Sequence, residues 1–270
     1  MSEKWVFLND SFRKEKEAFI PIGDRGFLFG DGLFTTIRVN HGQPEFVERH
    51  LKRLQRHAES LDFNLDCLQV DFITELINLN QAQEGIWRLK IIVTVVENEE
   101  KRELGILLAT LEPAQDFSFH SCILTLFPHP IERPLGNMKS LAYLDHLHVR
   151  NYAKRLGYTD AIKQTREGVL METGCSNLFW IDKGKCLVPD PTLPYLKGVF
   201  LESLLPYFSW PVEHLRVSIN ELPPTAHLYI CNALSHIRPV VCIDQRSFLR
   251  CEETEHQLRK AIVQSLQGND

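Results

Sequence analysis

The sequence predicts a mixed α/β protein, of the α+β kind, built as two domains. Three observations indicate this fold class. Apolar runs of strand length alternate with amphipathic helical stretches along all 270 residues. The predicted strands are joined by tight hairpins as well as by helical crossovers, which disfavours a purely parallel winding. A stretch with three prolines at 128, 130 and 134 separates two halves of this mixed kind.

The N-terminal half opens with an apolar strand and a charged loop. A segment with glycines at 23, 26, 30 and 32 follows, where we expect left-handed backbone or close approach of chains. The turn at 40–42 predicts a hairpin. Apolar residues at spacings of three and four predict a helix at 47–61. The remaining expected elements are strands at 5–8, 35–39, 86–96 and 105–111 and a helix at 72–79.

The C-terminal half repeats the mixed pattern. Strands are expected at 122–127, 161–162, 178–181, 186–188, 212–217, 226–231 and 240–243, and helices at 141–156, 199–208 and 253–266. We predict an N-terminal domain at 1–118, a strand and proline-rich connection at 119–137, and a C-terminal domain at 138–270.

Composition excludes several classes of protein. A net charge of −5 gives no sign of a nucleic-acid or anionic-membrane partner. No apolar run approaches the roughly 20 residues of a membrane span, and the first residues lack the pattern of a signal peptide. The seven cysteines are scattered, so we expect unbridged thiols in a reducing cytoplasm and no metal site.

Two segments carry the residue types of aldehyde-cofactor chemistry. Lys139 and Tyr143 lie ahead of a predicted helix, and Glu172 precedes a small-residue turn and an apolar strand. A lysine amine can form a Schiff base with pyridoxal phosphate (PLP), and an acid can pair with its ring nitrogen. Taken alone, each is more often a solvated charge than part of a cofactor site.

Four further features have two interpretations each. The glycines at 23–32 form either a phosphate cradle or a tight turn, although their spacing excludes the dinucleotide-binding and P-loop patterns. The helix start at 197–200 and the turn at 232–235 are either anion sites or ordinary loops. Arg53 is either a phosphate ligand or part of a solvated helix face.

Six ordered blocks together resemble fold-type IV PLP enzymes, which include branched-chain and D-amino acid aminotransferases and 4-amino-4-deoxychorismate lyases. The blocks lie at 24–38, 50–54, 139–143, 172–179, 196–199 and 232–240. The resemblance implies two α/β domains with PLP between them, and a homodimer whose partner completes the substrate pocket. Within the family, the segments 29–38 and 229–234 are most similar to the lyase.

The resemblance also assigns roles to individual residues. It implies that Lys139 forms the Schiff base, Glu172 pairs with the ring nitrogen, and Tyr143 lies near the phenolic oxygen. The residues that would hold the phosphate or line the cofactor are Arg53, Ser176, Asn177, Gly198, Val199, Phe200 and Asn232. Thr35, Arg38 and Lys90 are candidates for binding the substrate.

The implied reaction converts 4-amino-4-deoxychorismate to 4-aminobenzoate and pyruvate, a step of folate biosynthesis. The alternatives are an aminotransferase for D-amino or branched-chain amino acids, and a relative without catalytic activity. The alternatives rest on departures from the family pattern, which are Ala142, Leu201 and the acidic turn at 95–100.

Overall fold

The computed structural model describes residues 3–65, 68, 70–97 and 101–268, and the chain forms two compact units. Unit 1 comprises residues 1–116 and 139–143, and unit 2 comprises residues 117–138 and 144–270. The segment that carries Lys139 therefore belongs to unit 1, whereas the sequence placed it in the C-terminal domain. Residues 98–100 of the predicted acidic turn at 95–100 lie outside the described residues, and so does Cys67.

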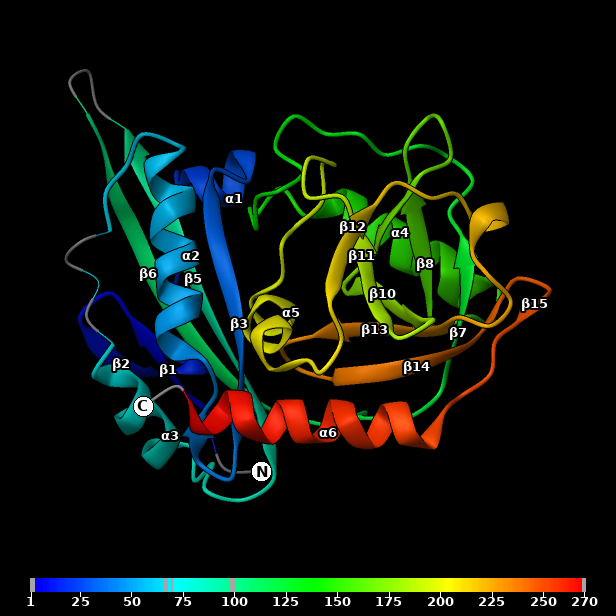
Figure 1. Cartoon of the computed structure of the whole chain (residues 1–270). Helices are drawn as coiled ribbons and strands as arrows, with labels where there is room; N and C mark the ends of the chain where they lie inside the picture. The colour runs from blue at the N-terminus through cyan, green and yellow to red at the C-terminus, as the bar shows by residue number, and fades with distance from the viewer. Residues whose placement is uncertain (1–2, 66–67, 69, 98–100, 269–270) are drawn as a thin grey trace. The chain divides into compact units, whose positions relative to one another are not determined.

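Unit 1 is built on an antiparallel sheet of six strands with the order β2-β1-β6-β5-β3-β4 (Figure 1). The strands are β1 (Trp5–Leu8), β2 (Ser11–Lys14), β3 (Gly32–Asn40), β4 (Gln43–Pro44), β5 (Ile86–Glu97) and β6 (Arg102–Ala114). β3 and β5 pair over nine residues, from Gly32 opposite Thr94 to Asn40 opposite Ile86. This long ladder makes β3 a rigid support for the residues at its start.

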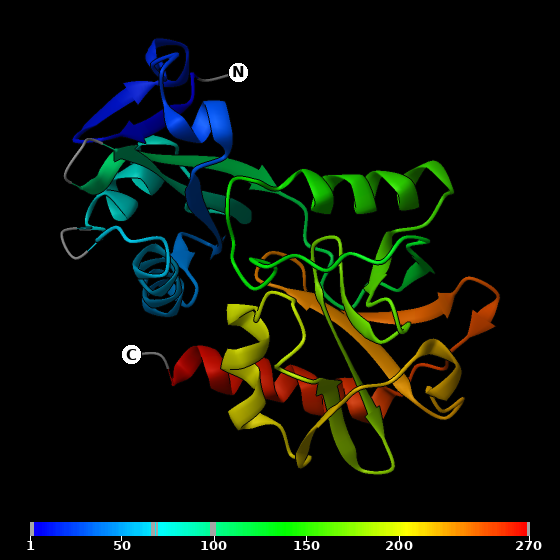
Figure 2. The same ribbon diagram turned by 90° about the horizontal axis from the view of Figure 1, so that it is seen from above.

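Two helices, α2 (Val47–Glu59) and α3 (Phe72–Leu79), pack on this sheet (Figure 2). Leu54 and Leu76 of the helices and Ile37 and Leu89 of the sheet are at most 2% exposed and share one core. A shorter helix, α1 (Arg25–Phe29), begins where Asp24 accepts a hydrogen bond from the Phe27 N–H. The fold of unit 1 is thus a sheet covered by the apolar faces of amphipathic helices.

Unit 2 contains a nine-stranded sheet of mixed direction, with the path β12-β11-β10-β13-β14-β7-β8-β9 and β15 beside β14. Its strands are β7 (Cys122–Leu126), β8 (Asp160–Gln164), β9 (Leu170–Thr173), β10 (Asn177–Asp182), β11 (Lys185–Pro189), β12 (Val212–Leu215), β13 (His227–Asn232), β14 (His236–Ile243) and β15 (Arg246–Ser247). β9 also pairs with β10, with Glu172 opposite Asn177, so six of these strands form a closed circuit. Glu172 lies at the point of closure.

Apolar side chains from the strands of this circuit form the core of unit 2, including Leu124, Leu178 and Ile230, each at most 2% exposed. Three helices belong to the unit: α4 (Leu144–Arg155), α5 (Val199–Leu204) and α6 (Glu252–Gln267). Val149 and Ala153 of α4 pack against Ala161 of β8. Short 3-10 turns complete the elements at Glu15–Glu17, Leu205–Tyr207 and Ile219–Glu221.

The mixed α/β fold class is confirmed, and the predicted helices at 47–61, 72–79 and 253–266 are present with ends within two residues. Three details of the sequence prediction were wrong. The charged loop at 10–17 contains strand β2, the glycine-rich segment contains α1, and α4 begins at Leu144 rather than residue 141. Two of these elements depend on local contacts that the sequence pattern did not reveal, because Asp24 caps α1 and β2 pairs with β1 in a short hairpin.

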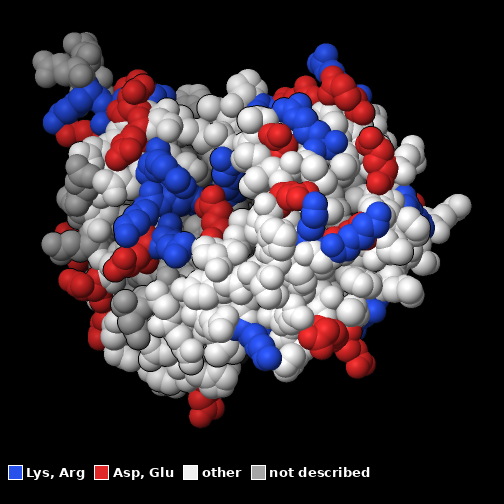
Figure 3. Space-filling model, in the orientation of Figure 1, with Lys and Arg blue, Asp and Glu red and all other residues white. Residues whose placement is uncertain are grey.

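Figure 3 shows Lys and Arg side chains gathered over α2, whose exposed basic residues are Arg49, Lys52 and Arg56. These surround the position of Arg53, which is itself buried at 5% exposure. Among the described residues, no helix has the length and apolar character needed to cross a membrane.

Candidate active site

Lys139 lies in an extended segment of unit 1 that pairs with the start of β3. The Phe34 N–H donates to the Lys139 carbonyl oxygen at 3.0 Å, and the Leu141 N–H donates to the Gly32 carbonyl oxygen at 2.9 Å. Leu33 and Ser140 form an antiparallel bridge between the two segments. Lys139 is therefore held by backbone pairing with the start of β3, and the helix that follows it, α4, begins only at Leu144.

Glycines allow this close approach. Gly30 has a φ of +70°, and a Cβ there would lie 3.0 Å from the Ala142 backbone nitrogen. A Cβ on Gly32 would clash with the Val93 carbonyl oxygen of β5 and would lie 2.8 Å from Leu141 Cδ1. The packing of residues 139–143 thus accounts for Gly30, and that of β5 and Leu141 accounts for Gly32, which favours the tight-turn interpretation over a phosphate cradle.

The side chain of Lys139 lies among aromatic rings of the same unit. Its Nζ is 4.6 Å from the centroid of the Phe34 ring and 5.1 Å from that of the Tyr143 ring. The two rings meet edge to face, with centroids 5.1 Å apart and an interplanar angle of 87°. The Nζ of Lys90 also lies over Phe34, at 4.7 Å. Two amines therefore share one ring, and partial burial together with the charge of Arg88 lowers the pKa of Lys90.

A buried polar network in unit 1 contains the predicted residues Thr35 and Arg53. Arg53 Nη2 donates to Thr35 Oγ1 at 3.0 Å, and Thr35 Oγ1 lies 2.7 Å from Nδ1 of His50. His50 is 1% exposed, and burial followed by the charges of Arg53 and Lys139 lowers its pKa well below the usual value. His50 is consequently neutral at pH 7.

His57, which the sequence did not indicate, contacts the backbone of the proposed nucleophile. The Lys139 N–H donates to His57 Nδ1 at 3.3 Å. Burial, followed by the charges of Arg53, Arg56 and Lys139, lowers the pKa of His57 from 6.5 to about 4. A neutral His57 can accept this hydrogen bond, whereas a protonated one cannot.

Arg38, one of the three candidates for binding the substrate, has a structural role in unit 1. Its side chain is 3% exposed and is ion-paired with Asp116 at 3.0 Å and with Glu45 at 3.6 Å. A guanidinium paired with two carboxylates is accounted for without a ligand. These ion pairs position Arg38 within unit 1, and binding of a substrate carboxylate by Arg38 or Lys90 stays a prediction.

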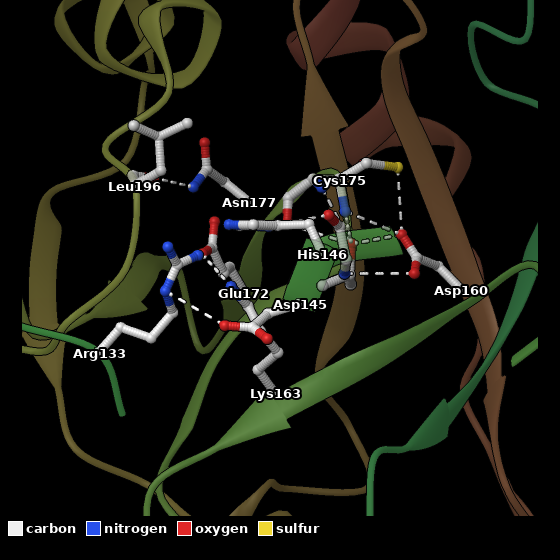
Figure 4. Close-up of polar contacts among 12 residues, drawn as sticks. Arg133, Asp145, His146, Asp160, Lys163, Glu172, Cys175, Asn177 and Leu196 are labelled. Atoms are coloured by element: carbon white, nitrogen blue, oxygen red, sulfur yellow. Dashed lines mark hydrogen bonds and ion pairs between the residues drawn. The ribbon is translucent and has the colours of Figure 1, made fainter. Parts of the chain in front are cut away.

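In unit 2, Glu172 forms a buried ion pair with Lys163 of β8 (Figure 4). Lys163 Nζ lies 2.6 Å from Glu172 Oε1, and both side chains are 5% exposed. The charge of Glu172 contributes, after burial, to raising the pKa of Tyr195 to about 12. Lys163 and Tyr195 are the neighbours of Glu172 that sequence reasoning missed.

Asp160 at the start of β8 fixes the turn that follows Glu172. Its carboxylate accepts hydrogen bonds from Thr173 Oγ1 at 2.8 Å, from the Gly174 N–H at 3.2 Å and from the Cys175 N–H at 3.2 Å (Figure 4). A charged acceptor with three donors is a strong local constraint. The turn from Glu172 to Asn177 is therefore held in one conformation.

The other predicted cofactor residues of unit 2 surround the same turn. Asn177 Nδ2 donates to the Leu196 carbonyl oxygen at 2.7 Å, which ties β10 to the segment before α5. Asn232 Nδ2 donates to Ser176 Oγ at 2.9 Å, and its Oδ1 accepts from the Ser235 N–H at 2.8 Å. These contacts show how Ser176, Asn177 and Asn232 are positioned, and they give Asn232 a structural role in its turn.

The segment predicted to hold a phosphate through its backbone is the start of α5. Gly198 is the residue before the helix, and Val199 and Phe200 form its first turn. Phe200 is 1% exposed and stacks on His236, with ring centroids 4.6 Å apart. Packing of Phe200 fixes the helix start, so any contact of this residue with a phosphate would come from its N–H group.

Comparison with known proteins shows the family. The model of the amino-transferase class IV family matches residues 32–243, and the chain belongs to this family. An aminodeoxychorismate lyase from Bacillus subtilis is 24% identical over 207 residues, which cover 72% of this chain and 70% of the relative. A D-alanine aminotransferase from Staphylococcus aureus is 22% identical over 264 residues, covering 88% and 89%.

The fold agrees with solved members of the group. A branched-chain aminotransferase from the thermophilic archaeon Thermoproteus uzoniensis, solved with norvaline, aligns with a TM-score of 0.85 and 18% identity, covering 98% of this chain and 96% of that one. The fold-type IV architecture is confirmed. The protein is an enzyme of the PLP-dependent class IV family.

The residues present fit PLP. Within unit 1 a lysine amine lies beside aromatic rings, and within unit 2 a buried carboxylate is ion-paired with a lysine. These are the groups that PLP chemistry requires of a protein, namely an amine for covalent attachment and an acid for the ring nitrogen.

Proposed function

We propose that this protein is a PLP-dependent lyase that converts 4-amino-4-deoxychorismate to 4-aminobenzoate and pyruvate. The observation that carries the proposal is Lys90, whose Nζ lies over the same Phe34 ring as the Nζ of Lys139. The substrate has two carboxylates, and neither is attached to the amine-bearing carbon. A second cation close to, but distinct from, the nucleophilic lysine suits a substrate of that shape.

Lys139 would hold PLP through its amine, and the freed amine would take the proton from the amine-bearing carbon of the substrate. PLP would supply the electron sink, and Glu172 would support its ring nitrogen. The bond from the substrate ring to the enolpyruvyl oxygen would break as the ring becomes aromatic, and the proton held by Lys139 would pass to the leaving enolpyruvate, which is released as pyruvate. Lys90 and Thr35 would orient the substrate in unit 1.

The remaining cofactor contacts are proposed from the family pattern. Tyr143 would lie at the phenolic oxygen of PLP. The phosphate would be held by Arg53 and by the backbone N–H groups of residues 198–200. Ser176, Asn177 and Asn232 would shape this part of the site through the hydrogen bonds described above, with Asn232 also a candidate for direct contact.

An aminotransferase acting on D-amino or branched-chain amino acids is the second candidate, favoured by the 88% of this chain that aligns with the D-alanine aminotransferase. A relative without catalytic activity is less well supported. Ala142, one of the departures that suggested it, fits closely against Gly30, so a small residue there has a packing reason. Leu201 is likewise 7% exposed within α5.

The decisive assay measures pyruvate and 4-aminobenzoate released from 4-amino-4-deoxychorismate by the holoenzyme. Transamination of pyruvate or 2-oxoglutarate with D-alanine and with branched-chain L-amino acids is measured beside it. We expect equimolar release of both products, with transamination at least about a hundredfold slower in kcat/KM, the difference one lost charged contact can make. Transamination without release of 4-aminobenzoate would establish the second candidate instead.

We also propose a homodimer in the cytoplasm. Six large apolar side chains between residues 19 and 29 are exposed: Phe19 at 77%, Ile20 at 41%, Ile22 at 87%, Phe27 at 71%, Leu28 at 51% and Phe29 at 68%. Apolar surface concentrated in this way is typical of an interface. Sedimentation should show a dimer for the native chain and a monomer for Ile22→Lys with Phe27→Lys. The six described cysteines are unbridged, as a reducing compartment requires.

A further inference from the structure

Lys163 is a buried charged residue that the reaction described above does not use. It lies in β8 at 4% exposure, and its Nζ is 2.6 Å from Glu172 Oε1. Buried lysines are costly to desolvate, and they are tolerated when a paired acid compensates. Its partner Glu172 is the residue expected to bind the ring nitrogen, so Lys163 lies directly beside that proposed contact.

The hairpin geometry fixes this pair before any cofactor arrives. β8 and β9 are antiparallel, with Ile162 opposite Thr173 and an irregular register between Ile162 and Gln164. Asp160 at the start of β8 accepts hydrogen bonds from the turn that follows Glu172. The two strands that carry Lys163 and Glu172 are therefore joined at this end as well as by the hairpin.

The charge state of the pair follows from its surroundings. The Tyr195 hydroxyl donates to the Pro189 carbonyl oxygen at 2.9 Å, and its pKa of about 12 keeps it neutral. Asn177, opposite Glu172 in the sheet, is uncharged. Glu172 therefore interacts with the ammonium of Lys163 at short range, and a protonated ring nitrogen would be a second cation on the same carboxylate.

We propose that Lys163 is a positioning residue that shares the Glu172 carboxylate with the ring nitrogen of bound PLP and lowers the proton affinity of that nitrogen. One carboxylate charge then serves two cations, which repel each other at this distance. PLP is consequently a weaker electron sink than it would be if the Glu172 carboxylate interacted with the ring nitrogen alone. This proposal rests on the PLP part of the proposed function and is independent of the choice between lyase and aminotransferase.

The test is the ¹⁵N chemical shift of PLP labelled at its ring nitrogen and bound to the protein at neutral pH. Lys163→Gln removes the charge and keeps a hydrogen-bond donor. We expect this variant to move the resonance towards the position of a protonated pyridinium. Lys163→Arg, which keeps the charge, should leave it near the native position. Lys163→Met serves as a second neutral variant if Lys163→Gln does not fold.

Two further variants separate this effect from a general disturbance. In a Glu172→Gln background, Lys163→Gln should move the resonance by less than a third of its effect in the native chain, because Lys163 acts through Glu172. Lys185→Gln breaks the exposed pair of Lys185 with Glu213 in the same unit and should move nothing. Denaturation of the apoprotein gives an independent readout. The variant that combines Lys163→Gln with Glu172→Gln should have a higher free energy of unfolding than Lys163→Met alone.

Failure of the proposed function and failure of the role of Lys163 would give different results. A native protein that takes up no PLP overturns the proposed function and this inference together. A native protein that binds PLP, but whose ring resonance stays at the native position in both Lys163→Gln and Lys163→Met, overturns only the role of Lys163. Equal effects of Lys163→Gln with and without Glu172→Gln also overturn it, because Lys163 would then act independently of Glu172.

Discussion

In unit 1, Lys139 is placed by its backbone, against the start of β3, and its amine lies over the rings of Phe34 and Tyr143. In unit 2, Glu172 is placed by its side chain, in an ion pair with Lys163 that is 5% exposed on both sides. A nucleophilic amine must be free to change bonds during a reaction, whereas a carboxylate that supports a ring nitrogen must keep one charge and one position. The difference between the two regions matches these two requirements.

Substitution of Lys139 should have the largest effect of any change in unit 1. Lys139→Ala removes the amine and should abolish the visible absorbance band of lysine-bound PLP, with kcat lower by at least about 10²–10⁴. Absorbance and product formation are measured on the same samples. Lys154→Ala, on the exposed side of α4, is the control and should change neither. An intact band in Lys139→Ala would place the covalent link elsewhere.

Substitution of Lys90 separates substrate binding from cofactor binding in unit 1. The Nζ of Lys90 lies over the same Phe34 ring as that of Lys139, but Lys90 is proposed to act on the substrate alone. Lys90→Met should raise KM for 4-amino-4-deoxychorismate by about 10- to 100-fold, the range for one lost charged hydrogen bond, and leave PLP absorbance unchanged. Lys14→Met removes another lysine that lies over a ring, that of Trp5 at 3.7 Å, and should leave KM unchanged. A change in PLP binding with unchanged KM would assign Lys90 to the cofactor.

Backbone placement of Lys139 is tested at the glycines. Gly30→Ala introduces both a left-handed alanine and a contact with Ala142, whereas Gly85→Ala, at φ +72° with nothing within 4 Å, introduces only the first. The left-handed conformation costs about 1–2 kcal/mol. We expect Gly30→Ala to lower the free energy of unfolding by about 1–3 kcal/mol more than Gly85→Ala does, because the added methyl group overpacks the site. Gly30→Ala should also weaken PLP binding. Equal losses in urea denaturation would contradict a packing role for Gly30.

The smallest effect concerns His57. The unfolded chain binds a proton near pH 6.5 and the folded chain only near pH 4, so the free energy of unfolding should fall as the pH is lowered through this interval. His57→Asn can still accept the Lys139 N–H and should flatten this dependence in the apoprotein, leaving the part due to His50. His41→Asn, at an exposed position, should not alter the slope. An unchanged slope in His57→Asn would show that His57 titrates alike in both states.

The sequence predicted the elements with strong periodicity and the chemistry of the site residues. α2 and α3 follow from apolar spacing, and the ordered blocks led to Lys139 and Glu172. The extended pairing of Ser140 with Leu33 was not predictable, because it joins residues more than a hundred positions apart. The ion pair of Arg38 was not predictable for a similar reason, since its partner Asp116 lies 78 residues away.

Lys163 could have been recognised from the sequence. It directly follows the apolar residues Ala161 and Ile162 of a predicted strand, and in the structure this strand pairs antiparallel with β9, which carries Glu172. A charged residue inside an apolar strand, paired in sequence with an acid across a turn, indicates a buried ion pair. His57 left no such signal, because its contact with the Lys139 backbone depends on the fold of unit 1.

Lys139, and not Lys90 or Lys163, is proposed to carry PLP. Reduction of the holoenzyme with borohydride makes the lysine–cofactor bond permanent, and mass mapping of peptides then locates it. We predict one modified peptide, which contains Lys139. Modification of Lys90 or Lys163 instead, or no modified peptide in a protein that has taken up PLP, would contradict this account of the site.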